Sequence, residues 1–296
     1  IGDRIDVNEY GSVVEVIETA FKNYAPRAAF TSIGLTMTYA DIDEKSAAFA
    51  SYLQNHTNLK PGDTIAIQMP NILQYPIAMY GALRAGLIVT NTNPLYTERE
   101  MLHQFNDSEA KALVCMDVFA RSVQNVKDKT GLETIIVTSL ADMMPTPKRI
   151  LINAATKYVK KMVPKYSLPD AISFRKALKL GQGQPFKAAP SKAHSDTAVL
   201  QYTGGTTGVA KGAELTHGNL IANMLQTKQN MQQVNDKGEL LKGDKQAIAV
   251  APLPLYHIYA FTAHLMAMFE QGEHSILIAN PRDTEMFIKF MMPWKL

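Results

Sequence analysis

The chain has 296 residues, of which 46% are hydrophobic and 19% are charged. This mixture is typical of a globular protein and excludes a disordered, collagen-like or coiled-coil chain. The length corresponds to roughly two domains, and the net charge of +3 is too small to indicate a nucleic-acid surface. The single cysteine, Cys115, excludes an intrachain disulfide and fits a reducing compartment.

The first half of the chain alternates strand and helix signals. Gly86 follows an apolar helical pattern at the position where a helix C-terminus favours glycine. Thr97 and Glu100 have the spacing of a capping box that opens the next helix. Strands separated by single helices predict βαβ units and a parallel sheet. The predicted order is strand 64–69, helix 71–85, strand 87–91, a helix from Thr97, strand 112–116, helix 119–129 and strand 133–139.

A second α/β run follows a segment of different composition, 142–195. Its predicted elements are strand 197–202, helix 216–231, strand 247–251, helix 258–271, strand 275–279 and helix 284–292. Gly272 ends the second of these helices. The predicted fold class is therefore α/β, with two α/β lobes whose sheets are mainly parallel.

Two stretches without charge, 64–83 and 246–269, are each long enough to cross a bilayer. Both contain proline and polar residues, such as Gln74 and Pro76 in the first and Pro254 and His264 in the second. Prolines and unpaired polar groups are costly in lipid. We therefore interpret both stretches as buried strands and helices of an α/β core.

The intervening segment predicts a basic amphipathic helix. Between positions 148 and 166 there are six basic residues and no acidic one: Lys148, Arg149, Lys157, Lys160, Lys161 and Lys165. Thr146 is predicted as the N-cap, with Pro147 at the first helical position, and Pro164 ends the helix. Lysines gather on one side of the helix. Apolar residues gather on the opposite side: Leu151, Ile152, Ala155, Tyr158, Val159, Met162 and Val163. Such a helix can dock on its own domain with a solvated lysine face, or 148–165 can bind an anionic membrane surface.

A loop rich in glycine and threonine follows the predicted strand 197–202. Its residues are Tyr202, Thr203, Gly204, Gly205, Thr206, Thr207, Gly208, Val209, Ala210, Lys211 and Gly212. Glycines let backbone N–H groups approach an anion, threonine hydroxyls add donors, and Lys211 adds positive charge. The spacing fits neither a Walker A loop nor the dinucleotide-binding fingerprint. We therefore predict a phosphate-binding loop of an unusual type.

Other catalytic signatures are absent from the sequence. It contains neither a Gly-x-Ser-x-Gly elbow nor a His-Glu-x-x-His pair. The seven histidines show no zinc-binding spacing, so no metal site is predicted. His257 follows Pro254 in the second uncharged stretch, where the sequence alone allows a hydrogen-bonded core histidine or a functional one.

The loop 202–212, continued by 214–217, resembles the signature phosphate loop of the adenylate-forming superfamily of acyl-CoA synthetases, luciferases and peptide-synthetase adenylation domains. Segments 37–42, 83–86 with 93–100, and 254–258 resemble further motifs of this superfamily in the same order. Segments 163–166 and 168–174 are similar to bacterial long-chain fatty acid–CoA ligases. The resemblance spans essentially the whole chain. It implies an AMP-binding N-terminal domain with sub-lobes at about 45–190 and 195–296, with 1–44 packing on the second.

The resemblance also implies a two-step activation of a long-chain fatty acid. The carboxylate attacks the α-phosphate of Mg·ATP, which gives acyl-adenylate and pyrophosphate, and coenzyme A then displaces AMP. The implied partners are ATP, Mg²⁺, the fatty acid and coenzyme A, with no nucleic acid. Lys211 would add charge or brace the loop, and His257 would lie near the adenylate and the acyl carboxylate. The implied nucleotide-binding residues are Tyr202, Thr203, Gly204, Gly205, Thr206, Thr207, Gly208, Lys211 and Gly212.

The superfamily's adenine-, ribose- and magnesium-binding residues and its C-terminal catalytic lysine belong to motifs that this sequence lacks. We therefore expect an incomplete N-terminal domain without its C-terminal domain, inactive on its own. Strand edges left unpaired predict aggregation or a homodimer. Two alternatives stay open: a coenzyme A ligase for aryl or shorter acids, and a non-catalytic, membrane-associated acyl-binding module. The predicted location is the cytoplasm or the inner face of the cell membrane.

Overall fold

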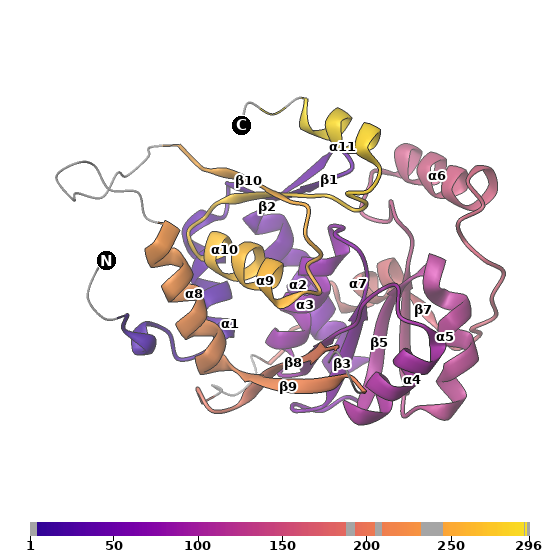
Figure 1. Ribbon diagram of the computed structural model, residues 1–296, viewed down its shortest axis with the longest axis horizontal. Coiled ribbons are helices and arrows are strands. Elements are labelled where there is room, and N and C mark those ends of the chain that lie inside the picture. The colour runs from indigo at the N-terminus through magenta and orange to yellow at the C-terminus, as the bar shows by residue number, and fades with distance from the viewer. Residues whose placement is uncertain (1–4, 188–192, 205–208, 232–244, 293, 295–296) are drawn as a thin grey trace.

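The computed structural model describes residues 5–187, 193–204, 209–231, 245–292 and 294 (Figure 1). Two sheets organise these residues. A seven-stranded sheet has the order β7-β6-β5-β3-β4-β8-β9, and a four-stranded sheet has the order β10-β11-β1-β2. The pairings are parallel except β1 with β2 and β8 with β9. The predicted α/β class with mainly parallel sheets is therefore confirmed.

The strands and helices follow the predicted order closely. The seven-stranded sheet contains β3 (Thr64–Gln68), β4 (Ile88–Asn91), β5 (Ala110–Met116), β6 (Thr134–Thr138), β7 (Ile172–Ser173), β8 (Thr197–Thr203) and β9 (Lys211–Thr216). The four-stranded sheet contains β1 (Ala28–Ser32), β2 (Leu35–Thr38), β10 (Ile248–Ala251) and β11 (His274–Leu277). The longer helices are α1 (Val13–Tyr24), α2 (Tyr39–Asn55), α3 (Gln74–Arg84), α4 (Glu98–Asp107), α5 (Ala120–Val126), α6 (Thr146–Ala154), α7 (Phe174–Gly181), α8 (His217–Met231) and α11 (Thr284–Met291).

The helix 258–271 is confirmed, with an irregular middle. A short α9 (Ile258–Ala260) continues into a π-helical stretch, Phe261–Ala267, and then into α10 (Met268–Glu270). Gly272, with φ +76°, follows the last turn as predicted. A π-helical segment inside an α-helix often marks a functional site, and this one begins four residues after His257.

The local signals at the ends of α3 and α4 were predicted correctly. Thr97 caps α4, and Thr97 and Glu100 form both bonds of the capping box. Gly86, with φ +85°, follows α3. The hairpin of β1 and β2 was not predicted, although Ile33 (φ 44°) and Gly34 (φ 80°) form its turn. Two successive positive φ angles are typical of the two-residue hairpin turn whose twist matches the strands.

The central strands of the larger sheet are buried on both faces. In β3, Ile65 and Ile67 belong to the main core, whereas Ala66 between them belongs to a second cluster. Leu113 and Cys115 of β5 join that second cluster. Because successive side chains of a strand point to opposite faces, the sheet separates α2, α3 and α7 from α4 and α5 (Figure 1).

Both uncharged stretches form strands and helices of the α/β core, but the second is exposed at Ile248, Leu253 and Tyr259. The first contains β3 and α3, and all of α3 is buried, including Arg84. Arg84 forms an ion pair with Asp43 (2.8 Å) and a hydrogen bond to Ser46 Oγ (2.7 Å). The second stretch contains β10, α9 and α10. Within the described residues, no helix combines the length and the apolar character needed to cross a membrane.

Strands from distant parts of the chain share each sheet. β8 inserts beside β4, with Val89 opposite Val199, although the two strands lie in different predicted sub-lobes. In the smaller sheet β1 lies between β11 and β2, with Phe30 opposite Ser275. The division into sheets therefore does not coincide with the predicted sub-lobes 45–190 and 195–296: β8 and β9 of the second segment belong to the sheet of the first.

The basic helix is shorter than predicted. α6 ends at Ala154 and continues as a π-helical turn, Ala155–Val159, rather than extending to Lys165. Thr146 is not its N-cap: Pro145 occupies that position and supplies no side-chain hydrogen bond. Lys161, with φ 50°, adopts the left-handed conformation in which a helix commonly terminates.

Candidate active site

Strands β8 and β9 form the two stems of the predicted phosphate loop. Thr203 pairs with Lys211 at the end of the β8–β9 ladder. Both residues and Gly204 are exposed. Four residues of the loop lie outside the described residues: Gly205, Thr206, Thr207 and Gly208. The loop leaves the carboxyl end of β8, and this is the edge at which α/β sheets bind ligands.

Tyr202 and Gly212 pack against each other below this loop. A Cβ atom at Gly212 would lie 2.8 Å from Cζ of Tyr202, so only glycine leaves room for the ring. The Tyr202 side chain is buried, and its hydroxyl donates to Oδ2 of Asp107 at 2.6 Å. Burial and this bond raise the pKa of Tyr202. Tyr202 therefore supports the loop stem, and its contact with a nucleotide stays a prediction.

Helix α4 holds the loop from below through two polar residues that the sequence analysis did not select. Asp107 accepts the Tyr202 hydrogen bond before the loop. His103 Nε2 lies 2.7 Å from the carbonyl oxygen of Ala210 after the loop. Because a carbonyl only accepts, His103 donates from Nε2. The available signal was their spacing of four residues, which places both on one face of the helix.

His257 lies at the start of α9 and is exposed. Its Nδ1 accepts a hydrogen bond from the backbone N–H of Tyr259 at 3.3 Å, so His257 is the N-cap of this helix. A neutral imidazole that accepts at Nδ1 carries its proton on Nε2. No hydrogen-bond partner of Nε2 is found in the part of the chain that the structure describes. His257 therefore presents an N–H donor that an oxyanion can use.

Gln201 brings the His257 segment next to the phosphate loop. Its Nε2 donates to the carbonyl of Tyr256 at 3.3 Å, and Gln201 itself lies two residues before Thr203. Its Oε1 accepts from Asn91 Nδ2 at 3.4 Å. The structure thus brings His257 and the described stem of the loop to the same end of β8.

A cavity of about 440 Å³ opens beside the His257 segment, between α8, β10 and the π-helical stretch. Its lining is largely apolar: Val250, Pro252, Leu253, Tyr259, Ala260, Ala263 and Met268, with Asn223, Thr227, Thr262 and His264. His264 Nδ1 lies 3.0 Å from Ser275 Oγ. Burial lowers the pKa of His264 to about 4, so this histidine is neutral at pH 7. The volume lies within the range of about 300–1,000 Å³ found for small-molecule sites.

Metal ligands do not gather in the described ranges. No group of three or more His, Cys, Asp or Glu residues in them is arranged to hold a metal ion. The described polar groups around the loop are hydroxyls, amides, Lys211 and His257, together with His103 and the carboxylate of Asp107.

Residues 17–292 match the family of AMP-binding enzymes. The chain belongs to this family. Of the relatives, the long-chain-fatty-acid–CoA ligase of Salmonella typhimurium (strain LT2) is 47% identical over 286 residues, covering 97% of this chain and 50% of the relative. This AMP-binding enzyme chain therefore spans about half the length of the curated relatives it matches.

Two solved structures share the fold of this AMP-binding chain. The anthranilate CoA ligase AuaEII in complex with anthranoyl-AMP superposes with a TM-score of 0.79 at 15% identity, covering 98% of this chain and 50% of that protein. The long-chain-fatty-acid-CoA ligase FadD1 from Archaeoglobus fulgidus superposes with a TM-score of 0.73 at 22% identity, covering 96% and 50%. The similarity of fold agrees with the superfamily resemblance of the phosphate loop.

Proposed function

We propose that this AMP-binding enzyme, as a whole protein, activates a long-chain fatty acid with ATP and transfers the acyl group to coenzyme A. The products are acyl-CoA, AMP and pyrophosphate, with acyl-adenylate as the intermediate. The observation that carries the proposal is the 47% identity to a long-chain-fatty-acid–CoA ligase across 97% of this chain. The family assignment favours an enzyme over the alternative of a non-catalytic acyl-binding module.

In the first step a fatty-acid carboxylate oxygen attacks the α-phosphorus of ATP. A new C–O–P linkage forms as the bond between the α-phosphorus and the bridging oxygen breaks, and pyrophosphate leaves with that electron pair. Backbone N–H groups of 203–208 and the charge of Lys211 would hold the leaving phosphates. The exposure of Thr203, Gly204 and Lys211 supports this role, since an anion can reach them.

His257 would act on the reacting end of the acid. Its Nε2–H would donate to a carboxylate or α-phosphate oxygen and so orient the nucleophile and the phosphorus. This role needs no proton transfer, because a fatty-acid carboxylate is already ionised at neutral pH. The support is the Nδ1 hydrogen bond at 3.3 Å, which fixes the tautomer that donates from Nε2.

The second step transfers the acyl group from the adenylate to coenzyme A. The coenzyme A thiol, as thiolate, attacks the acyl carbon, a C–S bond forms, and the C–O bond to AMP breaks. ATP would be bound as its magnesium complex, with phosphate oxygens among the ligands of the ion. The contribution proposed for this chain is therefore the phosphate grip and the orientation of the carboxylate.

The acyl chain would occupy the cavity of about 440 Å³ beside His257. A neutral His264 suits an apolar guest, because a charged imidazolium would lose solvation on contact with it. The alternative substrates, aryl or shorter acids, would use the same cavity. The anthranilate CoA ligase, which has the same fold, supports the alternative of an aryl acid.

An assay of the whole protein with oleate, Mg·ATP and coenzyme A tests the proposal. Oleoyl-CoA, AMP and pyrophosphate should form in equal amounts, and without coenzyme A the enzyme should support oleate-dependent exchange of pyrophosphate into ATP. Parallel reactions with octanoate, benzoate and 4-coumarate test the alternatives. A higher kcat/KM for any of these three acids than for oleate would contradict the long-chain assignment.

We also propose that α6 and the turn after it bind the surface of an anionic membrane, which would place the enzyme peripherally at the inner face of the cell membrane. The alternative was a helix docked through its apolar stripe. The docked face includes polar groups: Asn153 Oδ1 accepts from the N–H of Ala141 (2.9 Å), and Thr156 is buried, beside the half-buried Ile152 and Ala155. Five large apolar side chains are 53% to 78% exposed: Ile150, Leu151, Tyr158, Val159 and Met162.

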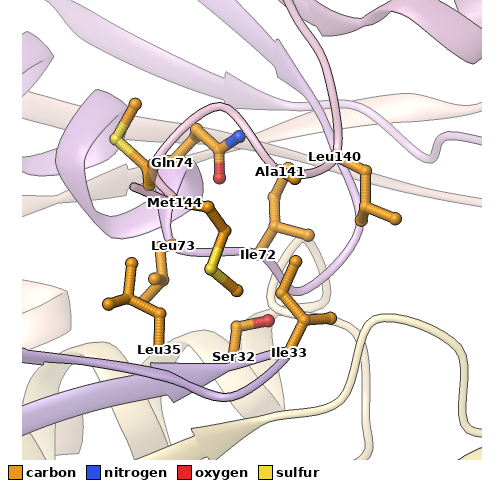
Figure 2. A pocket seen from close by; sticks show the side chains of 10 residues that line it. Ser32, Ile33, Leu35, Ile72, Leu73, Gln74, Leu140, Ala141 and Met144 are labelled. Carbon is orange, nitrogen blue, oxygen red and sulfur yellow. The ribbon is translucent and has the colours of Figure 1, made fainter. Parts of the chain in front are cut away.

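Helix α6 lies at the periphery of the protein (Figure 1), and the residue Met144 just before it packs against the core. Figure 2 shows Met144, just before α6, among apolar side chains of the β1–β2 hairpin and the β3–α3 connection, including Leu35 and Leu73. The gap between these side chains is only about 10 Å³. Exposed apolar groups beside six basic residues and no acidic one suit an anionic lipid interface.

A further inference from the structure

Asn71 lies in the connection between β3 and α3, and its side chain is 3% exposed. Its Nδ2 donates to the carbonyls of Ala251 (2.9 Å) and Leu253 (2.8 Å). Its Oδ1 accepts from the backbone N–H of Leu255 at 2.8 Å. One carboxamide therefore binds three alternate residues of the segment that joins β10 to α9, and this segment ends at His257.

The segment depends on this side chain because its own backbone has few donors. Pro252 and Pro254 lack an N–H, so the stretch cannot pair with a neighbouring strand in a regular ladder. Leu255 supplies an N–H between the second proline and His257, and Asn71 accepts it. The remaining local bond runs from the N–H of His257 to the carbonyl of Pro254, at 2.9 Å.

The His257 segment is thus held by two buried amides, Asn71 of the β3–α3 connection and Gln201 of β8. Asn71 binds residues 251–255, and Gln201 binds the carbonyl of Tyr256 at 3.3 Å. β10, from which the segment emerges, belongs to the smaller sheet. Without these amides, the placement of His257 relative to the phosphate loop would depend on packing between the sheets alone.

We propose that Asn71 is a positioning residue that fixes His257 relative to the phosphate loop during adenylate formation. This role rests on the proposed function and on the orienting role of His257 within it. Asn71 itself is buried, and its carboxamide is fully used by the segment, so it acts through His257 and not on substrate.

Asn71→Asp tests the role with little change of shape. The substitution removes the Nδ2 donors and places carboxylate oxygens against the carbonyls of Ala251 and Leu253. A displacement of a reacting group by about 1 Å can cost a hundredfold in rate. We expect kcat for oleate-dependent pyrophosphate exchange to fall about tenfold to a hundredfold, with the KM for ATP changed less than about twofold, because the phosphate loop is untouched.

A double-mutant cycle with His257→Ala separates positioning from general damage. If Asn71 acts through His257, Asn71→Asp should slow exchange by less than about twofold when His257 is already alanine. Gln74→Glu is the matched control: Gln74 is 1% exposed, and its Nε2 donates to Thr138 Oγ1 (3.0 Å) and the Ser139 carbonyl (2.9 Å). Its effect on exchange should be the same with and without the His257 side chain.

Equal slowing by Asn71→Asp in both backgrounds would overturn the positioning role. If Asn71→Asp does not fold, as judged by circular dichroism, Asn71→Ala removes all three bonds without adding charge and enters the same cycle. The absence of oleate-dependent exchange in the unsubstituted whole protein would overturn the proposed function itself. Wild-type exchange by His257→Ala would overturn the role of His257 and, with it, that of Asn71.

Discussion

The Tyr202 hydroxyl donates to Oδ2 of Asp107 at 2.6 Å and so joins strand β8 to the last residue of α4. Because burial and this bond raise the pKa of Tyr202, the phenol stays protonated and keeps donating at neutral pH. One turn earlier on α4, His103 donates to the carbonyl of Ala210. Tyr202 precedes the loop and Ala210 follows it, so a single helix fixes both ends of the loop.

Removing the Tyr202 hydroxyl should weaken this attachment. Tyr202→Phe should lower the free energy of unfolding by about 1–2 kcal/mol, because a hydrogen bond to a carboxylate is lost while the exposed Asp107 regains water. Asp107→Ala should cost a similar amount, and the double variant no more than either one. Urea unfolding of the four proteins measures this coupling, and strictly additive losses would contradict it.

Lys211→Ala in the whole protein should slow acyl-adenylate formation about tenfold to a thousandfold, the range for loss of one charge-stabilising contact. Its exposed position predicts no change in the thermal unfolding temperature. Lys176→Ala, at an exposed position of α7, is the matched control and should leave the rate unchanged. Pyrophosphate exchange at the wild-type rate in Lys211→Ala would refute the role of this lysine.

The free energy of unfolding should fall as the pH decreases from about 6.5 to about 4. In this range His264 is neutral in the folded protein but protonated in the unfolded chain. The folded pKa of about 4 lies below the ordinary value of 6.5, so the unfolded state binds more protons between these values. From pH 7 to pH 5 this linkage should cost about 2 kcal/mol.

His264→Gln should remove most of that dependence. Burial also lowers the pKa of His274, so a smaller slope of the same sign should remain. Urea unfolding of the two proteins at pH 7 and pH 5 provides the comparison. An equal pH dependence in both would show that His264 is solvated in the folded protein.

Vesicle binding should depend on the basic residues around the turn after α6. Lys157, Lys160 and Lys161 should each contribute roughly 1 kcal/mol near an anionic surface. Replacing all three with glutamate should abolish co-sedimentation with phosphatidylglycerol vesicles at low salt. A charge-matched control replaces exposed lysines elsewhere: Lys60, Lys176 and Lys179.

The apolar side chains should contribute separately from the charges. Leu151→Ser with Val159→Ser should weaken vesicle binding even at 0.5 M salt, where screening leaves mainly apolar insertion. If the control variant at Lys60, Lys176 and Lys179 loses vesicle binding to the same extent, the binding depends on net charge and not on this surface. Binding that neither set changes would assign this surface to a protein partner or to solvent.

The 296-residue chain alone should have no ligase activity and should bind ATP weakly. If the base and ribose contacts belong to the remainder of the whole protein, their loss of about 4 kcal/mol weakens Kd roughly a thousandfold. Edge strands such as β9 should also promote self-association. Calorimetry with Mg·ATP, an oleate assay and light scattering test these points. Micromolar affinity, or turnover above that of Lys211→Ala, would contradict the prediction.

Local signals predicted most of the elements, because they act over a few residues. The capping pair Thr97–Glu100 and the glycine after α3 each specify a helix end from within one turn. By contrast, Phe30 pairs with Ser275, which is distant in the sequence, so no local pattern indicates the pairing. Strands β1 and β2 were not predicted.

The site was predictable to the same extent. The phosphate loop and His257 belong to recognisable motifs, whereas Asn71 and Asp107 act through contacts between distant segments. For α6, periodicity predicted an amphipathic helix but not which face docks. The answer depends on one side chain, Asn153, whose amide binds the backbone of Ala141 and the carboxylate of Asp142.

The order of strands in the smaller sheet has a consequence for synthesis of the chain on the ribosome. β1 and β2 emerge early, but the parallel partner of β1 is β11, near the other end of the chain. Until residue 277 has left the exit tunnel, one edge of this hairpin stays open to pairing with other chains. Such non-local closure is slow and exposes the nascent protein to aggregation. Chains that terminate within residues 217–273 lack β11. They should therefore be insoluble unless chaperones keep them in solution.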